Sequence, residues 1–234
     1  MKEGSKRFKE ALKLVDRKKV YPLSEAVAIL KKVPKAKFDE TIELAIKLGV
    51  DAKQTEQQVR GTVSLPHGTG KKIRVLVFAK GESAKLAKEA GADHVGMEDL
   101  VEKVNKGWFD FDVVIAAPDT MREVGKLGKI LGPKGLMPSP KAGTVTQDVE
   151  KAVKEVKAGR VEFKMDKSGN LHLPVGKISF EEKDIVENAA AVIDAVQRSK
   201  PPSSKGDFVQ TCTISTTMGP GLRIMAKSGA TYET

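Results

Sequence analysis

The sequence is poor in the residues that build disulfides, metal sites and membrane spans. Its 234 residues include one cysteine, Cys212, and three histidines. A single cysteine forms no internal disulfide, and a zinc ribbon needs several thiolates, so both are excluded. The longest apolar runs, such as residues 113–118, are six residues long, whereas a helix needs ~18 to cross a bilayer. The charged N-terminus is not followed by the apolar core of a signal peptide, so we expect a cytoplasmic protein.

Motifs that carry enzyme chemistry are also missing. The glycine-rich residues 125–135 match neither a dinucleotide-binding fingerprint nor a phosphate-binding loop, and Gly68 and Gly70 precede a strand instead of following one. The histidines are scattered, without the spacing of a zinc site, and no serine lies in a nucleophile elbow. We therefore expect no catalytic site, metal or cofactor. A nucleotide-using enzyme, with a cofactor in the central third of the chain, stays open as the alternative.

What the sequence has in excess is positive charge. Lysine and arginine number 41 against 31 acidic residues, which gives a net charge of +10 and a pI near 9.5. Residues 1–37 alone hold 12 basic and 4 acidic side chains, whereas residues 160–234 hold 10 and 9. Such a balance favours a polyanionic partner. A lysine-rich, solvated helix face is the alternative explanation of the N-terminal excess.

The first and last thirds of the chain share one pattern. Residues 12–33 have helical apolar spacing, with Ser24 placed as the N-cap. Residues 38–49 and 59–65 then alternate with the period of half-buried strands. The remaining expected elements of this kind are strands at 160–165, 170–175 and 208–217 and a helix at 185–197.

The middle third alternates strands with helices instead. Expected strands lie at 73–79 and 112–117, and expected helices at 97–106, 120–131 and 147–158. Because a crossover helix is the usual link between parallel strands, this alternation favours a parallel sheet.

These patterns together predict a chain of α/β and α+β class. A discontinuous two-layer α+β domain, residues 1–69 plus 160–234, is expected to carry an inserted doubly wound (Rossmann-like) α/β domain, residues 70–159. Gly68, Gly70 and Gly159 lie where the chain crosses between the two and are the expected hinges.

Three segments suit an RNA partner. Lysines precede Phe38, whose ring is suited to stacking on a base or ribose; a core position at the start of the strand is the alternative. Residues 216–221 (TTMGPG) combine hydroxyls with little side-chain bulk, so their backbone is suited to close approach to RNA. A plain turn between two strands is the alternative there. Residues 131–143 form a basic loop in which Lys134 and Lys141 are possible additional phosphate contacts.

At these residues the chain resembles the bacterial L-one family of large ribosomal subunit proteins, the family of the mobile stalk beside the tRNA exit site. The resemblance covers essentially the whole chain, and the family's inserted second domain agrees with the break points above. The motifs that carry it, in the same order and spacing, are 36–41 (AKFDET), 59–68 (VRGTVSLPHG), 107–112 (GWFDFD), 125–138, 141–145 (KAGTV), 157–160 (KAGR) and 216–220 (TTMGP).

The resemblance implies an RNA-binding ribosomal protein that is not an enzyme. The positions that match the family's RNA-contacting motifs are Lys37, Phe38, Thr41, Thr217, Met218 and Gly219. The implied partners are the 23S ribosomal RNA of the large subunit, deacylated tRNA in the exit site and the chain's own operon messenger RNA, whose translation it would repress. No membrane partner is implied, and the free protein is expected to be a monomer. The runner-up is a dedicated messenger repressor that is not a stoichiometric ribosome component.

Overall fold

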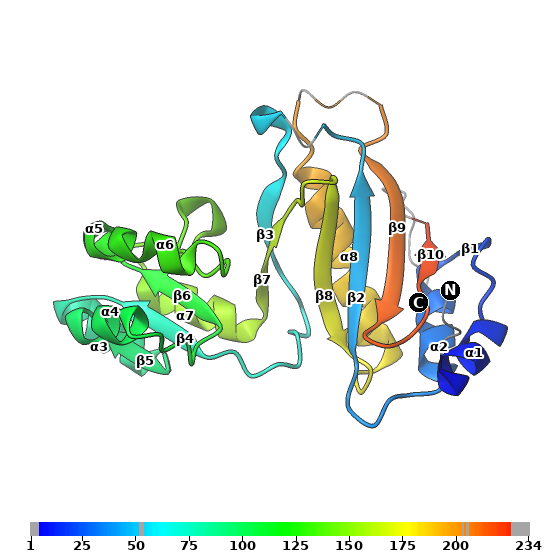
Figure 1. The fold of residues 1–234 in the computed structure, drawn as a ribbon, viewed down its shortest axis with the longest axis horizontal. Coiled ribbons are helices and arrows are strands. Elements are labelled where there is room, and N and C mark those ends of the chain that lie inside the picture. The colour runs from blue at the N-terminus through cyan, green and yellow to red at the C-terminus, as the bar shows by residue number, and fades with distance from the viewer. Residues whose placement is uncertain (1–4, 52–53, 203, 205, 226–234) are drawn as a thin grey trace. The chain divides into compact units, whose positions relative to one another are not determined.

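The computed structural model describes residues 5–51, 54–202, 204 and 206–225. The C-terminal tail that the sequence leaves without a role lies, from residue 226 onward, outside the described residues. The chain separates into two compact units, one formed by residues 1–70 with 161–234 and the other by residues 71–160. Each unit has its own β-strands (Figure 1) and its own buried apolar side chains.

The first unit is built on a five-stranded sheet with the strand order β1-β10-β9-β2-β8. The strands are β1 (Val20–Tyr21), β2 (Thr41–Leu48), β8 (Asn170–Lys177), β9 (Val209–Thr216) and β10 (Leu222–Ile224). β2 lies between β8 and β9 and is antiparallel to both. Its alternate residues Ile42, Leu44 and Ile46 are buried, whereas Glu43 is exposed. The period-two strand predicted from the sequence is therefore confirmed.

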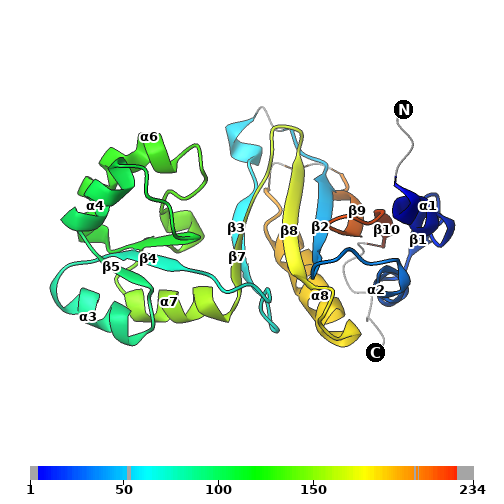
Figure 2. The same cartoon turned by 60° about the horizontal axis from the view of Figure 1, so that its bottom comes forward.

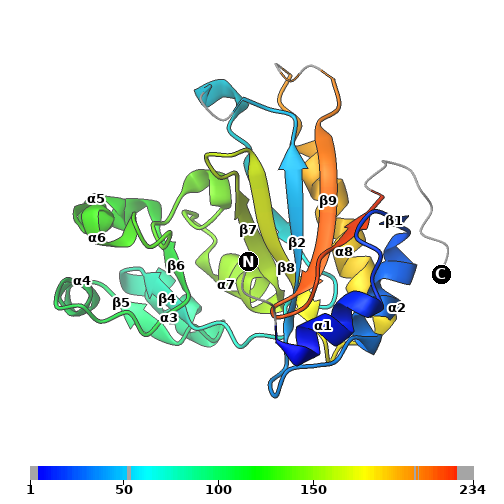
Figure 3. The same cartoon turned by 45° about the vertical axis from the view of Figure 1, so that its right-hand side comes forward.

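Helices α2 (Leu23–Lys32) and α8 (Glu182–Arg198) cover one face of this sheet (Figure 3). Their apolar side chains lie in the same core as the buried side chains of β2, β8 and β9. The unit is completed by α1 (Lys6–Lys13), the 3₁₀ turn η1 (Thr55–Gln57) and the two-stranded sheet of β3 (Arg60–Ser64) and β7 (Arg160–Lys164). A sheet with helices on one face is the α+β arrangement that the sequence indicates.

The helical apolar spacing predicted within residues 12–33 is confirmed from residue 23 onward, where Leu23, Ala26, Val27 and Leu30 are the buried residues of α2. Residues 14–22 are not helical, and Ser24 is not the N-cap. α1 ends at Lys13, and α2 begins at Leu23 with Pro22 as its N-cap. Proline suits this position because it has no N–H to leave unpaired and its φ of −58° is fixed by the ring. Its carbonyl accepts the N–H of Ala26 at 3.0 Å. Ser24 lies one residue inside the helix.

The second unit contains a three-stranded parallel sheet. β4 (Val75–Phe78) lies between β5 (His94–Gly96) and β6 (Val113–Ala116), and it is parallel to both, which confirms the expected strand direction. Figure 2 shows α3 (Gly81–Glu89) and α7 (Val149–Ala158) on one side of this sheet and α4 (Glu98–Asn105) and α6 (Gly128–Leu131) on the other. β4 accordingly sends alternate residues into two separate apolar clusters. Mixed α/β architecture is thus present in the chain.

The segment predicted as a helix over residues 120–131 is helical throughout, but it alternates between 3₁₀ and α-helical geometry. Its parts are η2 (Pro118–Thr120), α5 (Met121–Val124), η3 (Gly125–Leu127) and α6, and a further 3₁₀ turn, η4 (Pro140–Ala142), lies in the basic loop. Gly125 and Gly128 lie where the geometry changes, and glycine disfavours an α-helix by about 1 kcal/mol relative to alanine. Nothing lies within 4 Å of a Cβ built on either residue, so the packing of the unit itself does not require these glycines.

The expected hinge glycines have backbone conformations that suit glycine. Gly68, Gly70 and Gly159 have φ of +67°, +69° and +113°. A Cβ on Gly70 would lie 2.8 Å from the ring of Phe180, and Gly159 is the left-handed C-cap of α7. Any other residue at these three positions would therefore strain the backbone, so the glycines are explained by conformation alone, without a hinge motion.

Residues 67 and 68 are anchored to α8 by one buried side chain. The amide oxygen of Asn188 accepts the His67 N–H at 3.0 Å, and its nitrogen donates to the carbonyls of Gly68 at 3.0 Å and Val175 at 2.8 Å. Asn188 is fully buried. The segment that leads out of the first unit is thus fixed to a helix as far as Gly68.

The imidazole of His67 is expected to titrate above its ordinary pKa of about 6.5. The hydrogen bond to Glu187, 2.6 Å from Nε2, raises the pKa; desolvation opposes this, and the charge of Asp184, 3.4 Å from Nδ1, adds to the rise. The protonated imidazole therefore stabilises the folded protein. This contribution to the free energy of unfolding is complete below the unfolded-state pKa of His67 and is lost as the pH rises through its folded-state pKa. An NMR titration of the His67 ring measures this. Glu187→Gln should lower the midpoint, and a midpoint unchanged by that variant would contradict the assignment; Asp194→Asn on the same helix is the control.

Candidate RNA interface

Two segments that are far apart in the sequence meet at one end of the sheet of the first unit. Thr41 begins β2 and Thr216 ends β9, and Ile42 is the register partner of Thr216. The Thr41 N–H donates to Thr217 Oγ1 at 3.0 Å, and the Thr217 N–H donates to the Thr41 carbonyl at 3.0 Å. We call the six motif residues that lie on these two segments the two-segment surface: Lys37, Phe38, Thr41, Thr217, Met218 and Gly219.

The two-segment surface presents large apolar side chains to solvent. Phe38 and Met218 are each 53% exposed, although most large apolar side chains of the unit are in its core. The alternative that Phe38 is a core residue at the start of β2 is therefore wrong. An exposed ring beside the exposed Lys37 is the combination that stacks on an unpaired base while a cation meets the phosphate.

A buried carboxylate, Glu40, connects the two segments, although no motif in the sequence indicated it. Its Oε1 accepts the Ala36 N–H at 2.7 Å, and its Oε2 accepts the Met218 N–H at 3.0 Å. Thr216 also hydrogen-bonds to this carboxylate through its side chain. Glu40 is 1% exposed. The period-two pattern places residue 40 on the buried side together with Ile42, so an acidic residue at that position was the available signal.

Hydrogen bonds keep Glu40 ionised in spite of its burial. Burial acts to raise the pKa of Glu40, but the backbone N–H groups of Ala36 and Met218, the side chain of Thr216 and the charge of Arg7 together outweigh it. The net result is a pKa below the ordinary value for glutamate. The carboxylate therefore stays charged, and keeps its hydrogen bonds, at neutral pH.

The last residue of β8, Lys177, and the two residues after it form a third side of this region, which the sequence did not indicate. Lys177 Nζ donates to Thr41 Oγ1 at 2.9 Å, and Ser179 Oγ donates to Asp39 Oδ2 at 2.8 Å. The Ile178 N–H donates to the Glu40 carbonyl at 2.9 Å. These contacts hold the backbone on both sides of Glu40.

The two possible additional contacts, Lys134 and Lys141, belong to the other unit. Lys134 is exposed, and its Nζ lies 3.8 Å from the centroid of the Phe109 ring. The side chain of Lys141 lies outside the described residues. The structure therefore does not bring either lysine to the two-segment surface within one compact unit.

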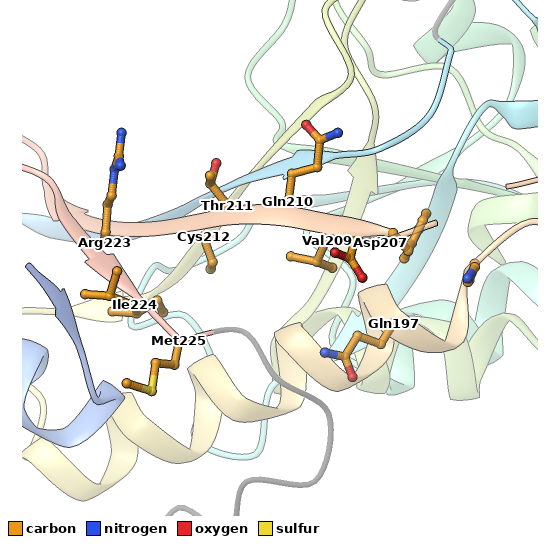
Figure 4. Close-up of a pocket in the computed structure, with 12 residues that line it drawn as sticks. Gln197, Asp207, Val209, Gln210, Thr211, Cys212, Arg223, Ile224 and Met225 are labelled. Carbon is orange, nitrogen blue, oxygen red and sulfur yellow. The ribbon is translucent and has the colours of Figure 1, made fainter. Parts of the chain in front are cut away.

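The lone cysteine is buried in the core of the first unit. Cys212 lines a hollow of about 680 Å³ that includes Gln197, Asp207 and Arg223. Figure 4 shows Cys212 pointing from β9 toward α8, whereas Thr211 points to the opposite side. Burial raises the pKa of the Cys212 thiol to about 12, so the thiolate needed for nucleophilic chemistry is absent at neutral pH.

Neither a metal centre nor a membrane helix is found in the part of the chain that the structure describes. Across residues 5–51, 54–202, 204 and 206–225, no group of three or more histidine, cysteine or acidic side chains is placed to hold a metal ion. Within the same residues, no helix is both long and apolar enough to cross a bilayer.

Comparison with known families identifies the chain. The family model described as the ribosomal protein L1p/L10e family matches residues 30–220. The chain belongs to this family. As a member of the L1p/L10e family it is a cytoplasmic, ribosome-associated protein of the large subunit that binds ribosomal RNA, and the family is one of structural proteins, not enzymes. The matched region contains all six residues of the two-segment surface, whereas Arg7 lies outside it.

Proposed function

We propose that this protein binds the 23S ribosomal RNA of the mobile stalk near the tRNA exit site through the two-segment surface. The observation that carries the proposal is the pairing of Thr41 with Thr217, which joins two RNA-contacting motifs 176 residues apart into one surface. Phe38 stacks on a base, and Lys37 neutralises a phosphate. The Thr217 hydroxyl also donates to the Thr41 carbonyl at 3.2 Å, so it retains one acceptor lone pair for the RNA.

The discontinuous domain, residues 1–69 plus 160–234, is proposed to hold the specific RNA site. Residues 70–159 would then form the inserted doubly wound, Rossmann-like domain, and Gly68, Gly70 and Gly159 would act as hinges between the two. Support comes from the location of the two-segment surface in the first unit and from the concentration of basic side chains in residues 1–37. A parallel sheet with helices on both faces supports the second part.

Replacing residues 71–159 with a short flexible linker is expected to leave most of the RNA affinity in place. Gly70 is retained because it packs against Phe180 of the first unit. Filter binding to a 23S stalk fragment measures the affinity, and circular dichroism checks the folding of the shortened chain. Specific binding by the isolated residues 71–160, together with its loss from the shortened chain, would overturn the assignment.

Two finer functions are proposed on the family resemblance. The chain would aid the release of deacylated tRNA from the exit site, with Lys134 and Lys141 as possible contacts. It would also repress its own operon by binding a messenger stem on the same surface as the ribosomal RNA. If one surface serves both RNAs, a stalk fragment must compete with the messenger stem, and Phe38→Ala must weaken both affinities equally. Simultaneous binding of both RNAs to one monomer would contradict a shared site.

A further inference from the structure

The carboxylate of Glu40 has no capacity left for an RNA ligand. Its two oxygens accept hydrogen bonds from Ala36, Met218 and Thr216 and from Nη1 of Arg7, 3.2 Å from Oε1. A carboxylate offers about four acceptor positions, and these four donors occupy them. A negative charge next to an RNA site is also electrostatically unfavourable, so direct attraction to RNA does not explain why this residue is there.

Arg7 meets three acceptors that come from both segments. Besides Glu40, its Nη1 donates to the Pro34 carbonyl at 3.2 Å, and its Nη2 donates to the Met218 carbonyl at 3.2 Å. Pro34 precedes the first segment, and Met218 lies in the second. A guanidinium can serve several acceptors at once because its donors form a rigid planar fork, whereas a lysine is a single point of charge. The side chain of Arg7 is 27% exposed.

We propose that Arg7 and Glu40 are positioning residues that hold the two halves of the two-segment surface in their RNA-binding arrangement before RNA arrives. The proposal rests on the proposed function of that surface. Glu40 fixes the backbone at Ala36 and at Met218, and Arg7 bridges Pro34 to Met218. Helix α1 thereby supports the RNA site without contacting RNA, although it lies outside the family-matched residues.

The physical benefit is preorganisation. A loop that is ordered only on binding loses conformational freedom at that moment, and affinity falls accordingly. Residues 34–40, which lead into β2 and include Lys37 and Phe38 of the first segment, have no regular secondary structure of their own. Their order in the free protein therefore depends on contacts such as those of Arg7 and Glu40.

The test compares Glu40→Gln and Arg7→Gln with two matched controls in the full chain. Glu43→Gln removes an exposed charge three residues along, and Arg17→Gln removes an exposed arginine just after α1. Affinity for a 23S stalk fragment is measured over a range of salt concentrations. We expect about a tenfold loss for each test variant, the scale of one or two lost hydrogen bonds, and near-wild-type affinity for the controls.

The salt dependence separates positioning from direct contact. Neither test variant should change the slope of log affinity against log salt, because neither side chain neutralises a phosphate. A slope lower by about one in Arg7→Gln would show a direct phosphate contact and overturn the positioning role of Arg7. Wild-type affinity in both variants would overturn the proposal as a whole.

Two further measurements distinguish local positioning from general stability. In Glu40→Gln, NMR should show faster hydrogen exchange at the amides of Ala36 and Met218 with unchanged exchange at Leu44. Glu40→Gln combined with Phe38→Ala should lose less affinity than the two separate losses together, because both act on the same contact. Additive losses or unchanged exchange would contradict the proposal.

Folding failure is covered by a conservative variant. If Glu40→Gln does not fold, Arg7→Lys keeps the charge and should still lose affinity several-fold, since a lysine cannot serve all three acceptors. Full affinity in Arg7→Lys would then overturn the bridging role. The proposed function fails separately, if Phe38→Ala and Thr217→Val both retain full affinity.

Discussion

Phe38→Ala is expected to weaken binding to a 23S stalk fragment by roughly 1–3 kcal/mol, the usual contribution of one base stacked on an aromatic ring. The free energy of unfolding should change by no more than about 0.5 kcal/mol, because the ring is exposed and its removal leaves no cavity. Isothermal titration calorimetry measures the first quantity and urea denaturation the second. The two results together assign the ring to recognition and not to the core.

Two other variants serve as references for this result. Leu86→Ala removes an exposed apolar side chain of the second unit and should leave RNA affinity unchanged. Lys37→Ala should lower the slope of log affinity against log salt by about one, whereas Phe38→Ala should leave that slope unaltered. If Phe38→Ala binds RNA like the wild type, the ring is not part of the interface, and the two-segment surface is drawn wrongly.

Asn188→Ala is expected to lower the free energy of unfolding by about 3 kcal/mol, because it removes three buried hydrogen bonds and leaves their backbone partners unpaired. The partners are the N–H of His67 and the carbonyls of Gly68 and Val175. Urea denaturation measures this loss, provided that the slope of the unfolding free energy against urea concentration is the same in the variant and the wild type. The loss of hydrogen bonds should be felt most at residues 67 and 68, in the segment that leads out of the first unit.

Asp194→Ala is the matched control for this variant. Asp194 lies on the same helix, is solvent-accessible and forms an exposed ion pair with Arg198, so its loss should cost no more than about 0.5 kcal/mol. A loss below 1 kcal/mol in Asn188→Ala would mean that water replaces the amide. The anchoring of residues 67 and 68 to α8 would then be weaker than their geometry indicates.

Local patterns in the sequence carried most of the architecture. The period-two alternation of β2 followed from apolar spacing, because burial on one face imposes that spacing. The parallel direction of β4 and β6 followed from the alternation of strands with helices, because a crossover helix usually links parallel strands. Helix boundaries were less accessible. Ser24 is a good N-cap by residue type, but Pro22 two residues earlier already fixes the start of the helix. The changes between α-helical and 3₁₀ geometry at Gly125 and Gly128 were likewise not predicted, because the apolar spacing there is helical throughout.

The supports of the candidate site were not predictable in the same way. Phe38 and Met218 belong to motifs, but whether Phe38 is exposed depends on what packs around it. Arg7 and Glu40 are separated by 33 residues, and Arg7 and Met218 by 211. Their contacts exist only once α1, β2 and β9 have assembled, so no local pattern reports them. In the sequence, these contacts were indicated by the acidic residue at position 40, which the period-two pattern places on the buried side of the strand.

The buried thiol of Cys212 makes this chain a convenient host for site-specific labels. It is the chain's one cysteine. Burial raises the pKa of its thiol to about 12, so it stays protonated at neutral pH. Maleimide reagents attack thiolates, so a cysteine introduced on the surface would react while the native one stays silent. Fluorophore pairs placed one on each unit would then report the distance between them directly, without a prior cysteine-free background.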